Sequence, residues 1–178
     1  MSEKMIGFIG GGNMASAIIG GLLSSGLSDK EHVSASDKNE NSVERLKESF
    51  GIQASTVNTE IRSRSDILFL AVKPDLFSVV IPEIRNTLKK ETVVVSIAAG
   101  QSIDKIQTAF GKPVKLIRVM PNTPALVGAS MSALCRNELV TDEELEEVYQ
   151  LFCSFGEAEV IPEKLMDAVV GISGSSPA

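Results

Sequence analysis

A glycine-rich turn near the start of the chain constrains the fold more than any other feature. Gly10, Gly12 and Ala15 lie between the apolar segment 5–9 and a second apolar segment, 13–24. This Gly-x-Gly-x-x-Ala spacing between a strand and a helix is typical of a dinucleotide-binding turn. Gly10 permits the tight turn, Gly12 lets the backbone approach phosphates, and Ala15 lets the helix pack close to the strand. A bound pyrophosphate would face the free N–H groups at the helix start.

Two other interpretations fit parts of this region. The first is a buried edge followed by a glycine turn that binds nothing. The second is a signal peptide or membrane span, because no charged residue occurs between Met5 and Ser28. The glycines, Asn13 and several serines interrupt that run, and its apolar core, 17–23, is too short to cross a bilayer. We therefore expect a soluble, cytoplasmic protein that does not contact a membrane.

Composition excludes several functional classes. The 178 residues allow one sizeable domain with or without an appendage, and the net charge of −6 argues against a nucleic-acid partner. Cys135 and Cys153 lack the spacing of metal ligands and are predicted to be reduced core thiols in a strand and a helix. His32 has no neighbouring His or Cys, so a structural role is expected and no metal site is predicted.

The order of apolar segments and turn signals alternates between strand and helix. This alternation predicts an α/β fold with a doubly wound, mainly parallel sheet, a Rossmann-like domain. The predicted strands are 5–9, 33–36, 52–54, 66–72, 92–98 and 114–120, the last ending at a turn over 121–124 whose two prolines break the strand. The predicted helices are 13–24, 41–49, a segment from Pro74 to 84, one capped by Ser102, and one opened by a capping box at 141–144. The last helix carries a core stripe of Leu145, Val148, Tyr149, Phe152 and Phe155.

Ligands of such sheets gather beyond the carboxyl ends of the strands. The segments expected there are small or turn-forming: 10–14, 37–38, 71–74, 98–100 and 120–124. Their exposed backbone groups suit a flat nicotinamide ring. The sequence has no nucleophile elbow, Walker loop or His-Glu-x-x-His motif, and a cofactor that carries its own hydride needs few protein acids or bases.

The residues after the second strand leave the choice of cofactor open. Asp37 lies where a carboxylate accepts hydrogen bonds from a ribose diol, which favours NAD(H). Lys38 can pair with a 2′-phosphate, which favours NADP(H). A solvent-facing turn with no ligand role is the alternative for both residues, and Lys73 can likewise extend into solvent from its loop.

Five strings of residues resemble the pyrroline-5-carboxylate reductase family: 8–14, 71–74, 95–100, 118–124 and 173–178. The resemblance runs from residue 5 to the last residue, and its Met-Pro-Asn-Thr-Pro and Ser-Gly-Ser-Ser-Pro-Ala strings are specific within the larger class of similar dehydrogenases. It implies reduction of 1-pyrroline-5-carboxylate to L-proline, the last step of proline biosynthesis, with NADP(H) or NAD(H) as cofactor.

The resemblance also assigns roles to residues. The implied pyrophosphate contacts are Gly10, Gly11, Gly12, Asn13 and Met14. Asp37 and Lys38 are implied on the adenosine ribose, and Asn58 on another part of that nucleotide. The implied neighbours of the nicotinamide and its ribose are Ala71, Val72, Lys73, Pro74, Ile97, Ala98, Ala99 and Gly100. The implied substrate contacts are Pro121, Asn122, Ser175 and Ser176, while no catalytic proton donor is assigned.

The end of the sequence has the composition of a helix N-terminus. We therefore expect a dinucleotide-binding domain over 1–172 and the start of a truncated helical dimerisation domain at 173–178. The resemblance implies that the full-length form is a homodimer or higher homo-oligomer, and that this fragment binds cofactor with little reductase activity. The alternatives are a hydroxyacid or prephenate-type dehydrogenase, or a non-enzymatic nucleotide-sensing module.

Overall fold

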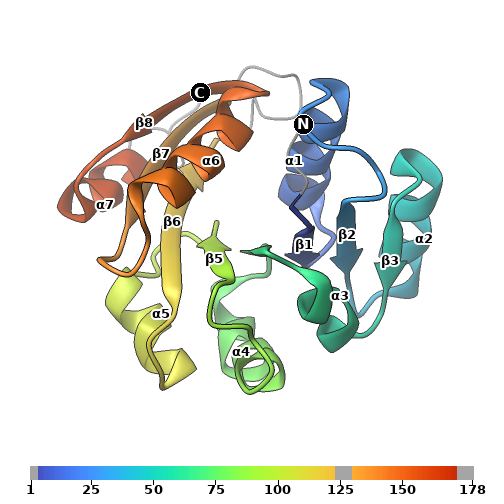
Figure 1. The fold of residues 1–178 in the computed structure, drawn as a ribbon, viewed down its shortest axis with the longest axis horizontal. Coiled ribbons are helices and arrows are strands. Elements are labelled where there is room, and N and C mark those ends of the chain that lie inside the picture. The colour runs from blue at the N-terminus through green and yellow to red at the C-terminus, as the bar shows by residue number, and fades with distance from the viewer. Residues whose placement is uncertain (1–3, 123–129, 172–178) are drawn as a thin grey trace.

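A single twisted sheet forms the centre of the molecule. The computed structural model describes residues 4–122 and 130–171. Its eight strands lie in the order β3-β2-β1-β4-β5-β6-β7-β8 (Figure 1). The strand bounds are β1 (Ile6–Ile9), β2 (Val33–Ser36), β3 (Gln53–Ser55), β4 (Ile67–Leu70), β5 (Val93–Ser96), β6 (Lys115–Pro121), β7 (Ser130–Arg136) and β8 (Gly156–Val160). Strands β3 to β6 are parallel, β7 is antiparallel to β6, and β8 is parallel to β7. The predicted α/β fold with a mainly parallel sheet is confirmed.

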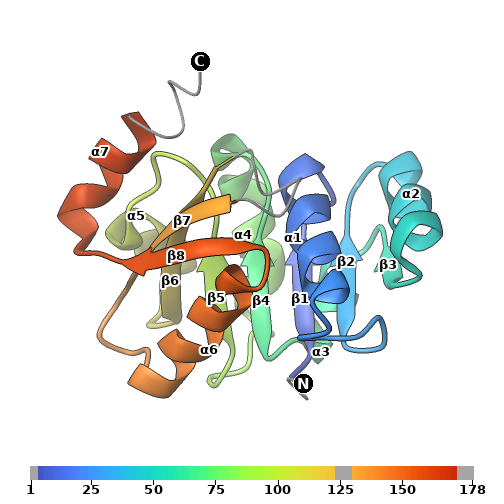
Figure 2. The ribbon, with the colours of Figure 1, turned by 90° about the horizontal axis from the view of Figure 1, so that it is seen from above.

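Helices cover both faces of this sheet. Helices α1 (Asn13–Ser24), α2 (Glu40–Phe50) and α6 (Asp142–Cys153) lie on one face. The other face carries α3 (Asn58–Arg64), α4 (Phe77–Arg85), α5 (Ile103–Phe110) and the short α7 (Met166–Val169). Two 3₁₀ turns, η1 (Pro74–Leu76) and η3 (Glu163–Leu165), lead into α4 and α7. Figure 2 shows α1 and α6 in front of the strands, with α4 and α5 behind them.

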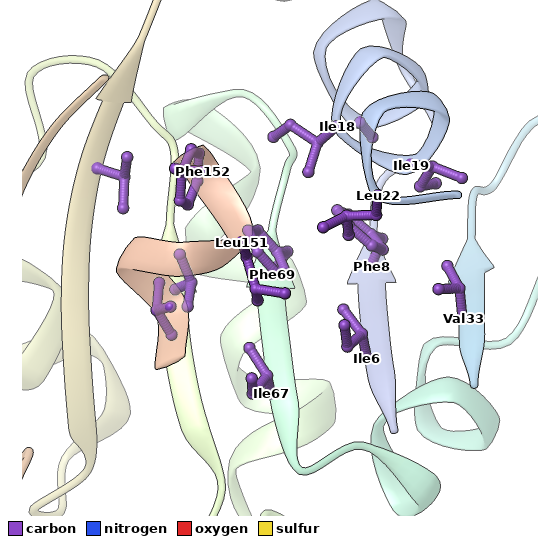
Figure 3. Packing of buried hydrophobic residues seen from close by; sticks show 14 of the residues in the cluster. Ile6, Phe8, Ile18, Ile19, Leu22, Val33, Ile67, Phe69, Leu151 and Phe152 are labelled. Carbon is purple, nitrogen blue, oxygen red and sulfur yellow. The ribbon is translucent and has the colours of Figure 1, made fainter. Parts of the chain in front are cut away.

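The core on the α1 face centres on three aromatic side chains. Phe8 of β1 and Phe69 of β4 stack with ring centroids 4.5 Å apart, and Phe152 of α6 lies 6.0 Å from Phe69 (Figure 3). All three rings are fully buried. Adjacent parallel strands thus join to α6 through one aromatic cluster, because Phe8 and Phe69 occupy paired positions of β1 and β4.

The central strands are buried at every residue, as expected for strands covered on both faces. This holds for β1, β2, β4 and β5. In β4, Ile67 and Phe69 belong to the core on the α1 face, while Leu68 and Leu70 belong to the core on the α4 face. The continuous apolar runs of the sequence therefore reflect two cores that share one sheet.

The predicted helix starts at Ser102 and Thr141 are confirmed. The Ser102 hydroxyl accepts a hydrogen bond from the Lys105 N–H. Thr141 and Glu144 form the reciprocal capping box, in which each side chain binds the other residue's backbone N–H. Among the helices of the described residues, none has the length and apolar character needed to cross a membrane.

The expected strand break at Pro121 is wrong. Strand β6 continues through Pro121, which pairs with Ser132 of β7. Proline is tolerated here because β5 ends at Ser96, opposite Arg118 of β6. Since hydrogen-bonding positions alternate along an antiparallel pair, the side of Pro121 that lacks an N–H faces the region beyond the end of β5. Thr123 and Pro124, the rest of the expected turn, lie outside the described residues.

The two cysteines and the single histidine lie in the core or make contacts within the fold. Cys135 is buried in β7, and Cys153 is half-buried at the end of α6; both are free thiols. Burial raises the pKa of the Cys135 thiol to about 11, so it remains protonated at neutral pH. His32 bonds through Nδ1 to Asp29 Oδ1 at 2.6 Å, which closes the turn before β2. Within the described ranges no group of three or more His, Cys, Asp and Glu side chains is arranged to hold a metal.

Candidate functional site

The carboxyl ends of the parallel strands meet at one edge of the sheet. Backbone hydrogen bonds continue past the strands and hold the loops side by side: Gly10 N–H donates to Ser36 O at 2.7 Å, and Ala71 N–H donates to Ile9 O at 2.8 Å. Ile97 N–H similarly donates to Leu70 O at 3.3 Å. The segments predicted to gather at the carboxyl edge therefore begin next to one another.

The turn between β1 and α1 requires glycine at Gly10. Its φ of +104° is unfavourable for residues with a side chain, and a Cβ there would lie 2.6 Å from the Ala71 carbonyl oxygen. Gly12 is different, because its φ of −70° and ψ of −174° are ordinary extended values. A Cβ on Gly12 would have no described heavy atom within 4 Å. At Gly10 the turn packs against Ala71, just after β4, whereas at Gly12 it faces open space.

Helix α1 begins at this open space. Gly12 is its N-cap and gives it no side-chain hydrogen bond in the described structure. Ala15 is 1% exposed, so the first turn packs directly against the sheet. The first N–H groups of a helix and the positive end of its dipole favour an anion at such a position. The cradle therefore fits a phosphate that approaches Gly12.

The loop after β2 braces this turn. Asp37 Oδ2 accepts a hydrogen bond from Gly11 N–H at 2.8 Å, and Asp37 Oδ1 accepts one from Asn39 N–H at 2.9 Å. From α2, Arg45 Nη2 donates to the Gly11 carbonyl at 2.8 Å. The N–H and the carbonyl of Gly11 are thus both held by charged side chains, one from the loop after β2 and one from α2.

A cavity of about 110 Å³ lies beside the turn, at the ends of β1 and β2. Its lining is Ile9, Gly10, Ser36, Asp37, Lys38, Asn58, Val72, Leu76, Val79 and Val80. Leu76 and Val79 are 42% and 45% exposed, so the apolar part of the lining is open to solvent. An apolar wall facing Asp37 and Lys38 suits a flat ring joined to a polar, charged group.

Asn58 and Glu83 form the polar end of this cavity region. Asn58 is buried at the start of α3; its Oδ1 accepts from Ser36 Oγ at 2.8 Å, and its Nδ2 donates to Glu83 Oε2 at 2.6 Å. Glu83 Oε1 also lies 3.5 Å from Lys38 Nζ. These contacts join β2, α3 and α4 around the cavity.

Comparison with known proteins identifies a family for the part of the chain that runs from β1 through β5. Residues 5–100, more than half of the chain, match the family model described as NADP oxidoreductase, coenzyme F420-dependent. The chain belongs to this NADP oxidoreductase family. It is also a homologue of the pyrroline-5-carboxylate reductases. It is 47% identical over 176 residues to the Escherichia coli (strain K12) pyrroline-5-carboxylate reductase, an alignment that covers 99% of this chain and 65% of that protein.

Solved structures of such reductases superpose closely on the fold. A pyrroline-5-carboxylate reductase from Coxiella burnetii is 29% identical with a TM-score of 0.94, covering 99% of this chain and 66% of that one. The Plasmodium falciparum pyrroline carboxylate reductase with NADP bound is 32% identical with a TM-score of 0.89, covering 99% of this chain and 64% of that one. The chain thus spans about 65% of the length of the curated Escherichia coli relative.

The residues assigned by resemblance fall into three groups within this NADP oxidoreductase fold. The first surrounds the glycine turn and the cavity: Gly10, Gly11, Gly12, Asn13, Met14, Asp37, Lys38, Asn58 and Val72. The second follows β4 and β5: Ala71, Lys73 and Pro74, then Ile97, Ala98, Ala99 and Gly100. Pro121 and Asn122 form the third group at the end of β6, where Asn122 Oδ1 accepts from Met131 N–H at 3.0 Å. Ser175 and Ser176 lie outside the described residues, and every ligand role in these groups stays a prediction.

Several residues of the site were missed by sequence reasoning. The cavity includes Ser36, Leu76, Val79 and Val80, and Glu83 binds two of its lining residues. A signal was available after Pro74, where Leu76 lies in η1 and Val79 and Val80 lie in α4, but the exposed Leu76 and Val79 look like core positions in a sequence. Helix α3, which carries Asn58, was also missed because its seven residues are too few for a clear periodic pattern.

Arg118 is a further buried group that sequence reasoning did not single out. It is 3% exposed on β6, and its guanidinium pairs with Asp167 at 2.8 Å and Glu163 at 3.4 Å. Glu163 Oε1 also accepts from Ile103 N–H at 2.7 Å, at the start of α5. This network joins β6 to α5, η3 and α7, so its contacts in the described structure serve the fold.

Asp37→Ala is expected to weaken the binding of NADPH and NADH together, by about tenfold, because it removes a charged hydrogen bond; tenfold is about 1.4 kcal/mol, near the lower end of the range of about 1.5–3 kcal/mol for such bonds. The main contact of the carboxylate is Gly11 N–H, which positions the turn for either nucleotide. Fluorescence titration with both cofactors tests this. A changed preference with no general loss of affinity would instead indicate that the carboxylate acts on the ribose.

Proposed function

We propose that this chain is the cofactor-binding part of a pyrroline-5-carboxylate reductase and binds NADP(H), or NAD(H), at the carboxyl edge of its sheet. The observation that carries the proposal is the open side of Gly12 at an uncapped helix start, beside the cavity lined by Lys38 and Asn58. The NADP-bound Plasmodium falciparum relative, at a TM-score of 0.89, supports it.

The residues present fit such a nucleotide. Gly10 to Met14 would hold the pyrophosphate through backbone N–H groups. Asp37, Lys38 and Asn58 would hold the adenosine ribose, with Leu76 and Val79 as the apolar wall of the adenine slot. When bound, the cofactor supplies a hydride, so the protein needs mainly to position the two reactants.

The substrate side is proposed from the resemblance and the relatives. Pro121 and Asn122, at the end of β6, would border 1-pyrroline-5-carboxylate. A hydride, that is a proton with two electrons, would reach the carbon of its C=N bond, and the nitrogen would take up a proton to give L-proline. A homodimeric or larger assembly and a cytoplasmic location complete the proposal, with residues 1–172 as the nucleotide domain and 173–178 opening a helical dimerisation domain.

Binding and turnover are tested separately. The chain is titrated with NADPH and NADH, and saturable binding to one site per chain is expected. A chimera that joins this chain to the last third of the Escherichia coli relative is then assayed for NADPH oxidation and proline formation. We expect turnover from the chimera and little from the chain alone.

The outcomes separate the candidate functions. Absence of nucleotide binding would overturn the proposal altogether. Binding by the chain without proline formation by a folded, dimeric chimera would favour a nucleotide-sensing module. Activity of that chimera on hydroxyacids or prephenate, but not on 1-pyrroline-5-carboxylate, would favour the other dehydrogenase classes.

A further inference from the structure

We propose that Glu83 sets the preference of this site between a 2′-phosphate and a 2′-hydroxyl on the nucleotide, because it holds Lys38 in an ion pair. This inference rests on the proposed function, since it concerns the ribose end of a bound NADP(H) or NAD(H). Glu83 is neither in the glycine turn nor in the loop after β2. It reaches the site from α4, the helix that also supplies the cavity residues Val79 and Val80.

The geometry places one carboxylate against two cavity residues. Glu83 Oε2 accepts from Asn58 Nδ2 at 2.6 Å, while Glu83 Oε1 lies 3.5 Å from Lys38 Nζ. The amide of Asn58 is fixed at its other end, because its Oδ1 accepts from Ser36 Oγ at 2.8 Å. The hydrogen bond orients Glu83, and the oriented carboxylate draws Lys38 toward α4.

The charges around Lys38 decide what it can offer a ligand. Glu83 pairs with it, whereas the carboxylate of the preceding residue, Asp37, accepts from the N–H groups of Gly11 and Asn39. The nearby guanidinium of Arg45 donates to the Gly11 carbonyl. A 2′-phosphate brings about 1.5–2 negative charges, as phosphate monoesters do near neutral pH. It must compete with Glu83 for Lys38, whereas a 2′-hydroxyl needs no cation.

The ion pair between Lys38 and Glu83 is partly exposed, so a ligand can break it. The side chains of Lys38 and Glu83 are 66% and 38% exposed, so water screens the attraction between them. A phosphate can therefore displace Glu83, at a cost that lowers the affinity for NADPH without preventing binding. The Asn58 contact keeps Glu83 close to the ligand even after displacement, so its negative charge continues to oppose the phosphate.

Glu83→Gln tests the inference directly. The glutamine carbonyl still accepts from Asn58 Nδ2, while the negative charge is removed and Lys38 is freed. We expect the affinity for NADPH to rise about three- to tenfold relative to that for NADH, the range for one partly screened charge. The affinity for NADH should stay within about twofold of wild type, which also reports that the cavity is intact.

Three further variants complete the measurement. Lys38→Met should lower the affinity for NADPH and not that for NADH. In the double variant of Lys38→Met with Glu83→Gln, the gain from Glu83→Gln should be much smaller than in the wild-type background, because the two residues act as a pair. Glu91→Gln removes an equal charge from the exposed residue 91, before β5 at the opposite edge of the sheet, and should leave the ratio unchanged.

The outcomes distinguish this inference from the proposed function. If wild-type protein binds neither nucleotide, the proposed function fails. If it binds both, and Glu83→Gln leaves the ratio unchanged or raises both affinities equally, the role of Glu83 is overturned. If Glu83→Gln raises the NADPH affinity by the full amount even in the Lys38→Met background, Glu83 does not act through Lys38. If Glu91→Gln shifts the ratio of the two affinities equally, the effect comes from net charge and not from the position of Glu83.

Discussion

Gly12→Val is expected to lower the affinity for NADPH at least about 100-fold while the protein stays folded, a loss of about 3 kcal/mol in binding free energy. The backbone of Gly12 has ordinary extended angles, and a Cβ there would meet no described heavy atom within 4 Å. The valine branches therefore occupy the space in which a phosphate would approach the start of α1. Stability should fall only by about 0.5–1 kcal/mol, since glycine is replaced by a poorer N-cap residue.

The measurement pairs cofactor titration with urea unfolding. Gly12→Ala should give an intermediate loss of affinity, because one methyl group blocks less of the approach. Gly10→Ala is the contrasting variant: its strained φ and its clash with the Ala71 carbonyl should destabilise the fold itself. Undiminished binding by folded Gly12→Val would mean that the pyrophosphate does not lie on this turn.

The central layers of the fold could be predicted from the sequence because local pattern and tertiary burial agree there. The apolar run at 66–72 contains β4, whose alternate residues enter two different cores. The helix at 13–24 was predicted with the bounds it has in the structure, since the glycine turn marks its start. Patterns of this kind are strong when covering helices bury both faces of a strand.

Edge elements could not be predicted in the same way. Strand β8 has the sequence Gly-Glu-Ala-Glu-Val, in which only Ala158 is buried, so it looks like a polar loop. Its strand conformation depends on pairing with β7, which is a tertiary contact. Pro121 was predicted to end β6 because proline is excluded from a central strand. The sequence does not show that β5 has already ended at this position, which leaves the proline without a β5 neighbour.

The candidate site divides along the same line. The backbone part, from Gly10 to Gly12, follows from a spacing that has a direct conformational meaning. The side-chain part depends on contacts between distant segments, such as Asp37 with Gly11 and Asn58 with Glu83. Asn58 entered the sequence reasoning only through family resemblance, and Glu83 did not enter it at all.

Phe69→Ala is expected to lower the free energy of unfolding by about 3–5 kcal/mol, the usual range for truncation of a buried phenylalanine. Phe69 is fully buried and stacks on Phe8, and its ring centroid lies 6.0 Å from that of Phe152 (Figure 3). Its removal leaves a cavity between two central strands and α6, where the regular sheet backbone prevents collapse. Chemical unfolding monitored by far-UV circular dichroism measures the change.

Phe69→Leu is the matched control, because leucine keeps most of the apolar volume and loses the ring contacts, and its loss should be clearly smaller. A domain of this kind has a total stability of about 5–15 kcal/mol, so Phe69→Ala removes a large part of it. Strand β4 ends at Leu70, and the carbonyl of the next residue, Ala71, lies against Gly10. Saturating NADPH should therefore recover part of the stability of Phe69→Ala by binding only the folded form. An equal loss in both variants would place the stabilisation in the strand backbone rather than in the aromatic cluster.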